Sequence, residues 1–384
     1  MKKYKIFLVV DGRATPKDDN RMWLKNLYEP LVALGHKVVL FDIADFENKH
    51  EVSCMSPEAK ELLSNELPIY FDQANQEYEF DIFLSYLHTK QIHPDAYGQI
   101  AKQLYTINYS TNFHQFDIYK DISKHANLNL FATKIAKDGY DKLGVKSYWM
   151  PFAANEEFCA SSEVKNDKVV FIGSAYGYRP YLFWRALQLG VDLNIYGVGW
   201  LKDFKSIKEK LVNKKGLLRL IVDLPSITSI NRRLIKFDQY NREAIIRKIN
   251  LDFPEAINNA VSDVDYFKII SEAAIVLNIQ SARYNFDVLN PHVLFGTNLR
   301  DFEITARGSF LLSQHSEEMG ELFNVGSEVV TYHDEFDLAE KAKYYLKHGS
   351  EREEIAKRGH ERCLRDHTWK KRFDDLFFYI DKLV

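Results

Sequence analysis

The sequence is poor in cysteine: it has three, Cys54, Cys159 and Cys363, and they lie far apart. An odd number of widely spaced cysteines gives neither a disulfide framework nor the paired spacing of a zinc site, and it is typical of a reducing compartment. The sequence also lacks an apolar run of about 18 residues, which a membrane-spanning helix needs. The apolar stretch Ile6–Val10 is too short for the core of a signal peptide. We therefore expect a cytoplasmic protein.

The sequence also lacks a large excess of positively or negatively charged residues. Lysine and arginine number 51 against 54 aspartates and glutamates, which gives a net charge of −3. This balance argues against a dedicated nucleic-acid binder, so we expect no nucleic-acid partner. With 46% hydrophobic and 27% charged residues, the chain is globular rather than disordered, and 384 residues exceed the length of one ordinary domain.

Two common phosphate motifs are also missing. No Gly-x-Gly-x-x-Gly opens the first apolar segment, and no Gly-x-x-x-x-Gly-Lys-Ser/Thr occurs in the chain. The sequence therefore gives no support to a dinucleotide-dependent enzyme or to a P-loop NTPase.

What is present is an alternation of short apolar runs with helical patterns. Ile6–Val10 has the form of a buried parallel strand, and a helical pattern begins at about Arg21 and ends at Gly35, before a second strand at Val38–Phe41. This order is typical of a right-handed βαβ unit. Further strands are expected at Asp81–Tyr86, Leu104–Asn108 and Leu128–Phe131. The first part of the chain is thus predicted to form a doubly wound parallel sheet.

The alternation restarts after Pro151, which interrupts regular structure. A second set of elements is expected: strands at Lys168–Gly173, Asp192–Tyr196, Ala274–Ile279, Ser309–Leu312 and Glu328–Tyr332, and helices at Tyr181–Leu189, Glu351–Arg365 and Thr368–Leu383. We predict an α/β protein with two Rossmann-like domains facing across a cleft. The boundaries are 1–153 together with 368–384 for the first domain, and 154–367 for the second.

A basic segment, 201–260, interrupts the second domain. Residues 201–250 carry thirteen lysines and arginines against five acidic residues, so they hold a charge of +8 while the remainder holds −11. One interpretation is a solvated helical insertion. The other is a basic, partly apolar surface for an anionic membrane or a polyanionic acceptor, which would place the protein peripherally at the inner face of a membrane.

Two clusters carry candidate chemistry in the second domain. Gly173 and Ser174 follow an expected strand and Arg179 lies just beyond, a pattern that suits a phosphate group. Glu303 lies on a helix that begins near Arg300 and ends at Gly308, and a carboxylate there could bind a ribose diol. Each cluster alone is equally compatible with an ordinary turn or a surface salt bridge.

Together these segments resemble the C-terminal domain of CgeB-like, spore-maturation-type glycosyltransferases. The matching stretches cover about 150–170 residues and follow one order, namely 168–179, 191–200, 265–278, 300–312 and 355–359. The N-terminal half resembles the family only at 34–38 and 150–153.

The resemblance implies a GT-B fold, with the nucleotide-sugar held by the second domain, the acceptor by the first, and a last helix that crosses back to the first domain. It implies that Glu303 binds the ribose and that the loop with Gly173, Ser174 and Arg179 faces the diphosphate. Three further residues of the matching stretches are assigned to the donor, and these are Asn278, Arg300 and Phe302. It also implies metal independence, no separate cofactor, and retention of configuration.

The sequence departs from the family pattern at two places. Relatives often carry a second glutamate eight positions before Glu303, where this chain has Phe295, and a lysine where it has Trp184. On the acceptor side, five residues are candidates for a base or a sugar contact: Asp11, His88, His93, His114 and His292. Of these we assign His114 and Asp11 as catalytic.

The predicted function is transfer of a sugar from a nucleoside-diphosphate donor, expected to be a UDP-sugar, to a glycan, lipid-linked or protein acceptor. Two alternatives remain open at this point. One is a nucleotide-sugar epimerase on the same fold. The other is a non-catalytic protein that docks on a polysaccharide or a membrane and has a degenerate donor site, for which Phe295 is the supporting feature.

Overall fold

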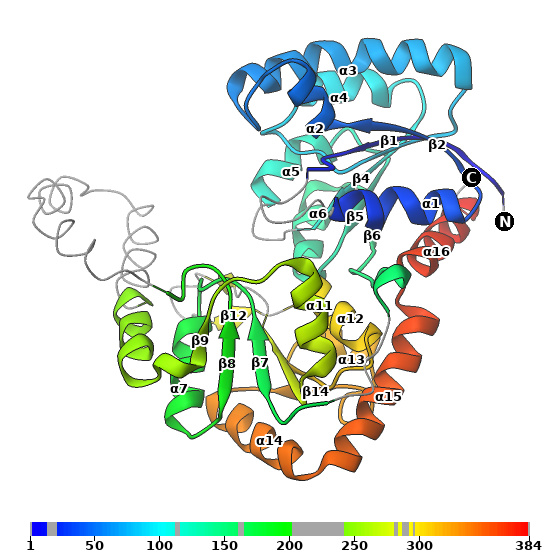
Figure 1. Ribbon diagram of the computed structural model, residues 1–384. Coiled ribbons are helices and arrows are strands. Elements are labelled where there is room, and N and C mark those ends of the chain that lie inside the picture. Colours follow the sequence, from blue (N-terminus) through cyan, green and yellow to red (C-terminus); the bar gives the residue numbers. More distant parts are fainter. Residues whose placement is uncertain are drawn as a thin grey trace, which may run out of the picture.

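The computed structural model describes residues 2–13, 21–111, 116–159, 165–201, 242–279, 283–285, 292–294 and 296–382. They form two units, each built on a parallel sheet of six strands with helices on both faces (Figure 1). This arrangement confirms the predicted fold class of two doubly wound α/β domains.

The first sheet has the strand order β2-β1-β3-β4-β5-β6, and every pairing is parallel. The strands are β1 (Lys5–Val10), β2 (Lys37–Asp42), β3 (Ile82–Ser85), β4 (Tyr105–Ser110), β5 (Leu128–Phe131) and β6 (Ser147–Trp149). The α-helices of this unit are α1 (Glu29–Ala33), α2 (Ile43–Lys49), α3 (Pro57–Tyr78), α4 (Pro94–Ala101), α5 (Phe116–Ser123) and α6 (Lys137–Leu143). A π-helical turn, Leu24–Tyr28, precedes α1 where the sequence predicted one continuous helix.

The second sheet has the order β14-β13-β10-β7-β8-β9 and is also parallel. Its strands are β7 (Val169–Ile172), β8 (Leu193–Tyr196), β9 (Ile257–Asn258), β10 (Ile275–Asn278), β13 (Leu311–Gln314) and β14 (Val330–Tyr332). Around it lie α7 (Arg179–Gln188), α11 (Asp263–Glu272), α12 (Leu299–Ala306), α13 (Glu317–Leu322), α14 (Glu335–Lys347) and α15 (Gly349–Asp366). The strands β11 (Arg283–Asn285) and β12 (His292–Leu294) pair antiparallel in a separate two-stranded sheet.

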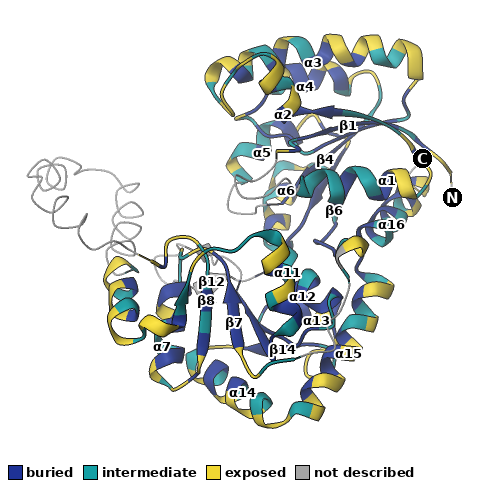
Figure 2. Ribbon diagram, in the orientation of Figure 1, coloured by how far each residue is buried: buried dark blue, intermediate teal, exposed yellow. Residues whose placement is uncertain are grey.

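The strands form the interior of each unit because both of their faces are covered by helices. Figure 2 shows the central strands of each sheet buried, whereas the edge strands β2, β6 and β9 are partly exposed. In the first unit Phe7 packs against Phe71 and Phe83, and in the second Phe171 packs against Phe183 and Trp200. Continuous apolar runs such as Ile6–Val10 are therefore the signature of strands that are buried on both sides.

The last helix, α16 (Trp369–Asp381), returns to the first unit, as predicted. The chain crosses beside its own first passage, since Ala154 N donates to His367 O at 2.9 Å and Trp369 N donates to Ala154 O at 3.1 Å. From there α16 runs against α1, where the ring of Phe377 stacks on Tyr4 with 5.0 Å between centroids (Figure 1). Apolar residues at helical spacing on α16 are thus explained by contact with the other unit.

A buried arginine holds the two crossing segments together. Arg372 of α16 donates to the carbonyl oxygens of Pro151, Phe152 and Asp366, and to Nδ1 of His367 at 2.9 Å. Because Nδ1 accepts from a guanidinium, the proton of a neutral imidazole lies on Nε2, which contacts Leu322 O at 2.6 Å. Burial above all, and then the charge of Arg372, lowers the pKa of His367 to about 4.

A second link crosses between the units at Glu318 of α13. The residue is 3% exposed, and its carboxylate accepts from the backbone N–H of Lys134 in the first unit. It also accepts from the backbone N–H and the hydroxyl of Thr297, both at 3.0 Å. The segment that leads into α12 is therefore tied to the first unit through one buried carboxylate.

Most of the basic segment predicted at 201–260 lies outside the described residues. The predicted contact of this segment with a membrane therefore stays a prediction. In the part of the chain that the structure describes, no helix combines the length and the apolar character that a membrane span requires.

We predict that acidification destabilises the protein through His367. Its pKa near 4 lies below the ordinary value of 6.5, so the unfolded chain binds a proton that the folded chain does not accept between these pH values. Stability should therefore fall by about 3 kcal/mol as the pH drops from 6.5 to 4. Thermal unfolding across this range should show a shallower fall for His367→Gln than for the parent chain. His348→Gln, at an exposed histidine, should keep the parent slope, and equal slopes in all three would contradict the assignment.

Candidate functional site

The second sheet has a topological switch point between β7 and β10. From β7 the chain moves outward to β8 and β9, whereas from β10 it moves the other way to β13 and β14. In open α/β sheets, ligands bind outside the carboxyl ends of the strands at such a point. Gly173 follows β7 directly and Asn278 ends β10, so these two predicted residues meet there; we call this place the second switch point.

Backbone contacts fix the loop that follows β7. Gly173 N donates to Tyr196 O at 2.8 Å, and the indole of Trp200 donates to Gly173 O at 2.6 Å. Gly197 adopts a φ of +143°, and a Cβ at this position would lie 2.3 Å from Gly173 O. Only glycine therefore lets the two loops approach so closely. Ser174 is left exposed at the loop surface.

Arg179, the first residue of α7, is buried and 2% exposed. Its Nη1 donates to Ser174 O at 3.1 Å and its Nη2 donates to Ile279 O at 2.8 Å. The side chain thus joins the loop after β7 to the end of β10. In this position it shapes the loop, and its guanidinium is held by backbone carbonyls.

Arg300 approaches the same loop from α12. A Cβ at Gly173 would lie 3.1 Å from Nη1 of Arg300 and 3.2 Å from Nη1 of Arg179, so two guanidinium groups converge beside this glycine. Burial is the main reason that the pKa of Arg179 falls to about 10, and the charge of Arg300 lowers it further. Two like charges held this close repel each other, and an anion between or above them would relieve the repulsion.

A buried carboxylate, Asp301, holds the start of α12. It accepts from Asn278 Nδ2 at 2.6 Å, from Ser313 Oγ at 2.8 Å, and from the backbone N–H of Asn298 at 2.9 Å. Asn298 in turn accepts from the backbone N–H of Arg300 at 2.9 Å. Asn278 therefore helps to position Arg300. The backbone N–H of Arg300, in the first turn of α12, is already bonded to the helix cap Asn298.

Glu303 lies three residues after Arg300 on α12. Its Oε2 accepts from the hydroxyl of Tyr266 at 2.8 Å, and the guanidinium of Arg300 lies 5.9 Å from the centre of the same ring. Burial raises the pKa of Glu303, while the charge of Arg300 opposes that rise. The carboxylate is thus oriented by a tyrosine and stands on the same helix as Arg300.

The other predicted residues lie elsewhere or are not described. Phe302 is 0% exposed and packs on Phe323 and His367, so its side chain belongs to the core. His114 lies outside the described residues, as does the side chain of His292. His93 pairs with Glu61 at 2.6 Å on the surface between α3 and α4.

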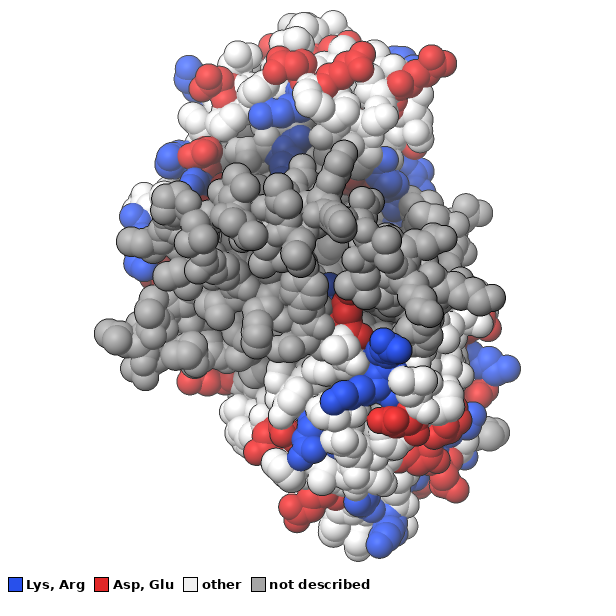
Figure 3. Space-filling model, turned by 90° about the vertical axis from the view of Figure 1, so that its left-hand side faces the viewer, with Lys and Arg blue, Asp and Glu red and all other residues white. Residues whose placement is uncertain are grey.

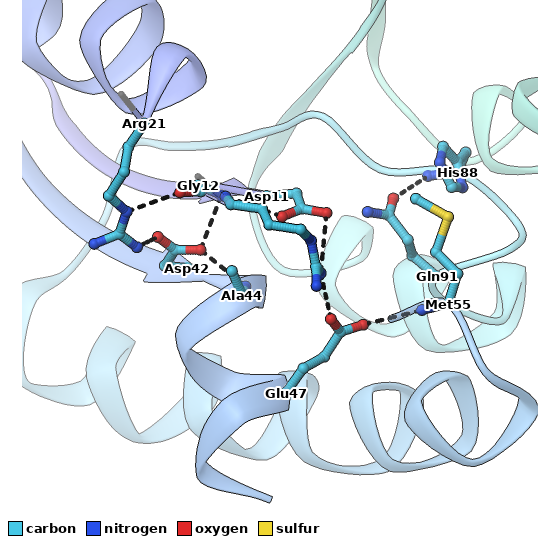
Figure 4. Close-up of polar contacts among 10 residues, drawn as sticks. Asp11, Gly12, Arg21, Asp42, Ala44, Glu47, Met55, His88 and Gln91 are labelled. Carbon is cyan, nitrogen blue, oxygen red and sulfur yellow. Dashed lines mark hydrogen bonds and ion pairs between the residues drawn. The ribbon is translucent and has the colours of Figure 1, made fainter. Parts of the chain in front are cut away.

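The first sheet has its own switch point, between β1 and β3. Asp11 follows β1 and His88 lies three residues beyond β3, so both lie at its carboxyl ends; we call this place the first switch point. The Asp11 carboxylate accepts from the backbone N–H of Arg13 at 3.2 Å, and the Arg13 guanidinium also pairs with Glu47. Figure 4 shows Arg21 with Asp42 on one side of Asp11, and His88 with Gln91 on the other.

Sequence reasoning missed Tyr266 and Asp301, whose roles depend on contacts between elements. It also overlooked an Asp-x-Asp tripeptide, Asp263 to Asp265. This tripeptide forms the first turn of α11, where Asp265 bonds to the Ser262 hydroxyl at 2.8 Å in a helix cap.

Charges on the side of the molecule to the left in Figure 1 are mixed. Figure 3 shows lysines and arginines interspersed with aspartates and glutamates on both units, with no broad surface of one sign among the residues it colours.

Comparison with known proteins identifies the family. The model of a family described as glycosyl transferase-like matches residues 179–377, which include α7, Asn278 and the whole of α12. The chain belongs to this glycosyl transferase-like family. The narrower CgeB-like resemblance stays a prediction, and no curated protein matches the chain.

Solved structures of similar fold support the same architecture. A glycosyltransferase from Rickettsia africae aligns with a TM-score of 0.62 at 12% identity, covering 100% of this chain and 99% of that one. Sucrose-phosphate synthase from Thermosynechococcus elongatus gives 0.61 at 12% identity and covers 99% of each chain. HepE from Anabaena, solved with UDP and glucose, gives 0.59 at 10% identity, covering 99% of this chain and 100% of that one. The glycosyltransferase chain therefore has the GT-B fold.

We predict that Gly197→Ala disrupts the second switch point of this glycosyltransferase. The added methyl group would collide with Gly173 O and force the loop after β7 to move, at a cost of about 2 kcal/mol or more. Thermal unfolding should show a lower Tm. The matched control is Gly320→Ala in α13, where a methyl group meets nothing within 4 Å and stability should not fall. An unchanged Tm in Gly197→Ala would contradict the close packing of the two loops.

Proposed function

We propose that this glycosyltransferase transfers a sugar from a nucleoside-diphosphate donor, with UDP as the nucleotide, to a glycan acceptor. The observation that carries the proposal is the convergence of Arg179 and Arg300 beside Gly173, at the switch point of the second sheet. It gives positive charge at the place where this kind of sheet binds ligands. HepE, a protein of similar fold, was solved with UDP-glucose, with 99% of this chain aligned.

In this proposal Arg300 contacts the diphosphate. Its backbone is fixed by the Asn298 and Asp301 cap, and its guanidinium reaches Gly173 from the helix. Arg179 adds a second positive charge beside Gly173. Its guanidinium also joins the loop after β7 to the end of β10, because it donates to Ser174 O and to Ile279 O. The growing negative charge of the departing diphosphate is stabilised by these groups, and we propose that no metal ion is required.

Glu303 is proposed to bind the ribose. The Tyr266 hydroxyl occupies Oε2 and fixes the carboxylate, and Oε1 is the atom we assign to the ribose hydroxyls. A carboxylate that is already oriented loses less entropy when it binds.

The transfer reaction forms one bond and breaks one bond, both at the anomeric carbon of the sugar. The acceptor oxygen bonds to the anomeric carbon while the bond from that carbon to the diphosphate oxygen breaks, and the electron pair leaves with the nucleoside diphosphate. In a retaining transfer, which the family resemblance implies, the acceptor proton passes to the departing phosphate. Asp11 of the first unit is the carboxylate assigned to the acceptor.

The test is nucleotide binding by the whole chain, measured by calorimetry with UDP, GDP, ADP, dTDP and CMP in the presence and absence of Mg²⁺. We predict that UDP binds without the metal and that Glu303→Ala weakens its binding by about tenfold or more, because a fixed acceptor of two hydrogen bonds is lost.

The matched control is Glu354→Ala, at an exposed glutamate of α15 that pairs with Arg358 on the surface. It should bind UDP as the parent chain does. Absence of binding to every nucleotide would overturn the proposed function and favour a docking protein. Conversion of UDP-sugar to its epimer without any acceptor would instead identify an epimerase.

A further inference from the structure

The strand β2 differs from the other edge strands of the protein. The two six-stranded sheets end at β2, β6, β9 and β14. Three of these strands have only two or three residues, whereas β2 has six, Lys37–Asp42. Proteins commonly protect their sheet edges by keeping the edge strands short, because an exposed edge is a template for pairing with another chain. The edge at β2 lacks this protection.

The outward backbone groups of β2 are unpaired among the residues that the structure describes. Lys37 N donates to Tyr4 O at 3.0 Å, so the backbone of Lys37 faces β1. Because the backbone groups of successive residues in a strand point to opposite sides, those of Val39 also face β1, and those of Val38 and Leu40 face away from it. No described residue bonds to the N–H or the C=O of Val38 or Leu40. These groups are available to a further strand.

Apolar side chains accompany this edge. The residues 38–40 are all partly exposed. On the face of the sheet that α3 covers, the ring of Tyr70 lies 5.2 Å from that of Phe41, and Tyr70 and its neighbour Ile69 are 47% and 58% exposed (Figure 1). An exposed apolar border beside an unpaired strand is typical of a surface that another protein chain covers.

The two ends of β2 carry opposite charge. Lys37, its first residue, is exposed. At the other end, Asp42 and Asp45 share Arg21 as an ion-pair partner, and the side chain of Asp45 is 66% exposed. A second copy of the strand in antiparallel orientation places the basic end of one copy beside the acidic end of the other. A parallel orientation would bring like charges together.

We propose that β2 is the interface of a symmetric dimer, in which β2 pairs antiparallel with β2 of the partner subunit and joins the two sheets into one. The two-fold axis passes beside Val39. Val38 then exchanges backbone hydrogen bonds with Leu40 of the partner subunit, and Leu40 does so with the partner's Val38, so all outward groups of both residues are paired. A two-fold interface requires such a self-complementary edge. This inference does not depend on the proposed function.

The symmetry also places the two α3 helices on one face of the joined sheet, next to the interface. A two-fold axis normal to the sheet reverses the direction of the strand but keeps each helical layer on its own side. A stable protein interface buries on the order of 1,000 Å² or more, which a single pair of strands does not supply. Ile69 and Tyr70 on each copy add apolar area to this surface.

The first experiment is sedimentation of the whole chain over a range of concentrations, which should show an equilibrium between monomer and dimer. We expect Val38→Pro to raise the Kd of the dimer by at least about tenfold, because each interface loses two hydrogen bonds. Proline removes an N–H that points away from β1, and it is tolerated on edge strands in that orientation. A Tm close to that of the parent chain would show that the variant is folded.

A second variant alters only the surface. Lys37→Glu should raise the Kd of the dimer by about fivefold or more, because it brings two acidic ends together. The matched control is Lys102→Glu, at an exposed lysine that follows α4, and it should dimerise as the parent chain does.

The register is tested by Val39→Cys under oxidising conditions. The two copies of this position face each other as a pair without hydrogen bonds, with Cα atoms about 4.5 Å apart, so a disulfide should join the subunits. The parent chain, which has an exposed Cys54, and Lys102→Cys are the controls and should stay without this cross-link.

The proposal is overturned if the parent chain is monomeric at every concentration. It is also overturned if a dimer forms whose Kd is the same in Val38→Pro and Lys37→Glu, since the interface then lies elsewhere. A monomeric chain that binds an extended peptide at β2 would assign the edge to a different partner. Cross-linking of Val39→Cys, together with a weaker dimer in Val38→Pro, would confirm the proposed pairing.

Discussion

The second switch point depends on one buried carboxylate, that of Asp301. It accepts hydrogen bonds from Asn278 on β10, from Ser313 on β13 and from the backbone at Asn298, so it joins two strands to the start of α12. A carboxylate buried without such partners would cost several kcal/mol, and with them it fixes the helix in position. Arg300 and Glu303 stand on this helix, and their places relative to Gly173 therefore follow from Asp301.

The link through Glu318 extends this constraint to the first unit. Its carboxylate bonds to Thr297, which immediately precedes the cap of α12, and to the backbone of Lys134 across the boundary between the units. A shift of one unit against the other would strain or break these bonds. The approach of the two units and the position of α12 are thus coupled through contacts that involve neither Gly173 nor Arg300.

The sequence was informative where local pattern decides structure. Apolar runs located most strands of both sheets, and Gly308 located the end of the helix that carries Glu303. The short strands β6 and β9 were not predicted, since β9 has only two residues. Helices were expected between the strands of the first sheet, but α3 was not located by residue range, because its two faces differ little in apolar character. The residues of the candidate site could be predicted only in part. Gly173 and Arg300 could be recognised in a motif, whereas Tyr266 and Asp301 act through partners 37 and 23 residues away.

Arg179 shows why residue type does not settle a role. Its position after a glycine loop predicted a phosphate contact, yet both terminal nitrogens of the guanidinium are held by carbonyl oxygens. Those carbonyls belong to the loop after β7 and to the end of β10, the two segments that define the second switch point. Because Arg179 donates hydrogen bonds to both carbonyls, its charge stays close to the loop, and Arg300 approaches the loop from α12. Arg179 therefore fixes the geometry of the site and also adds to its positive potential.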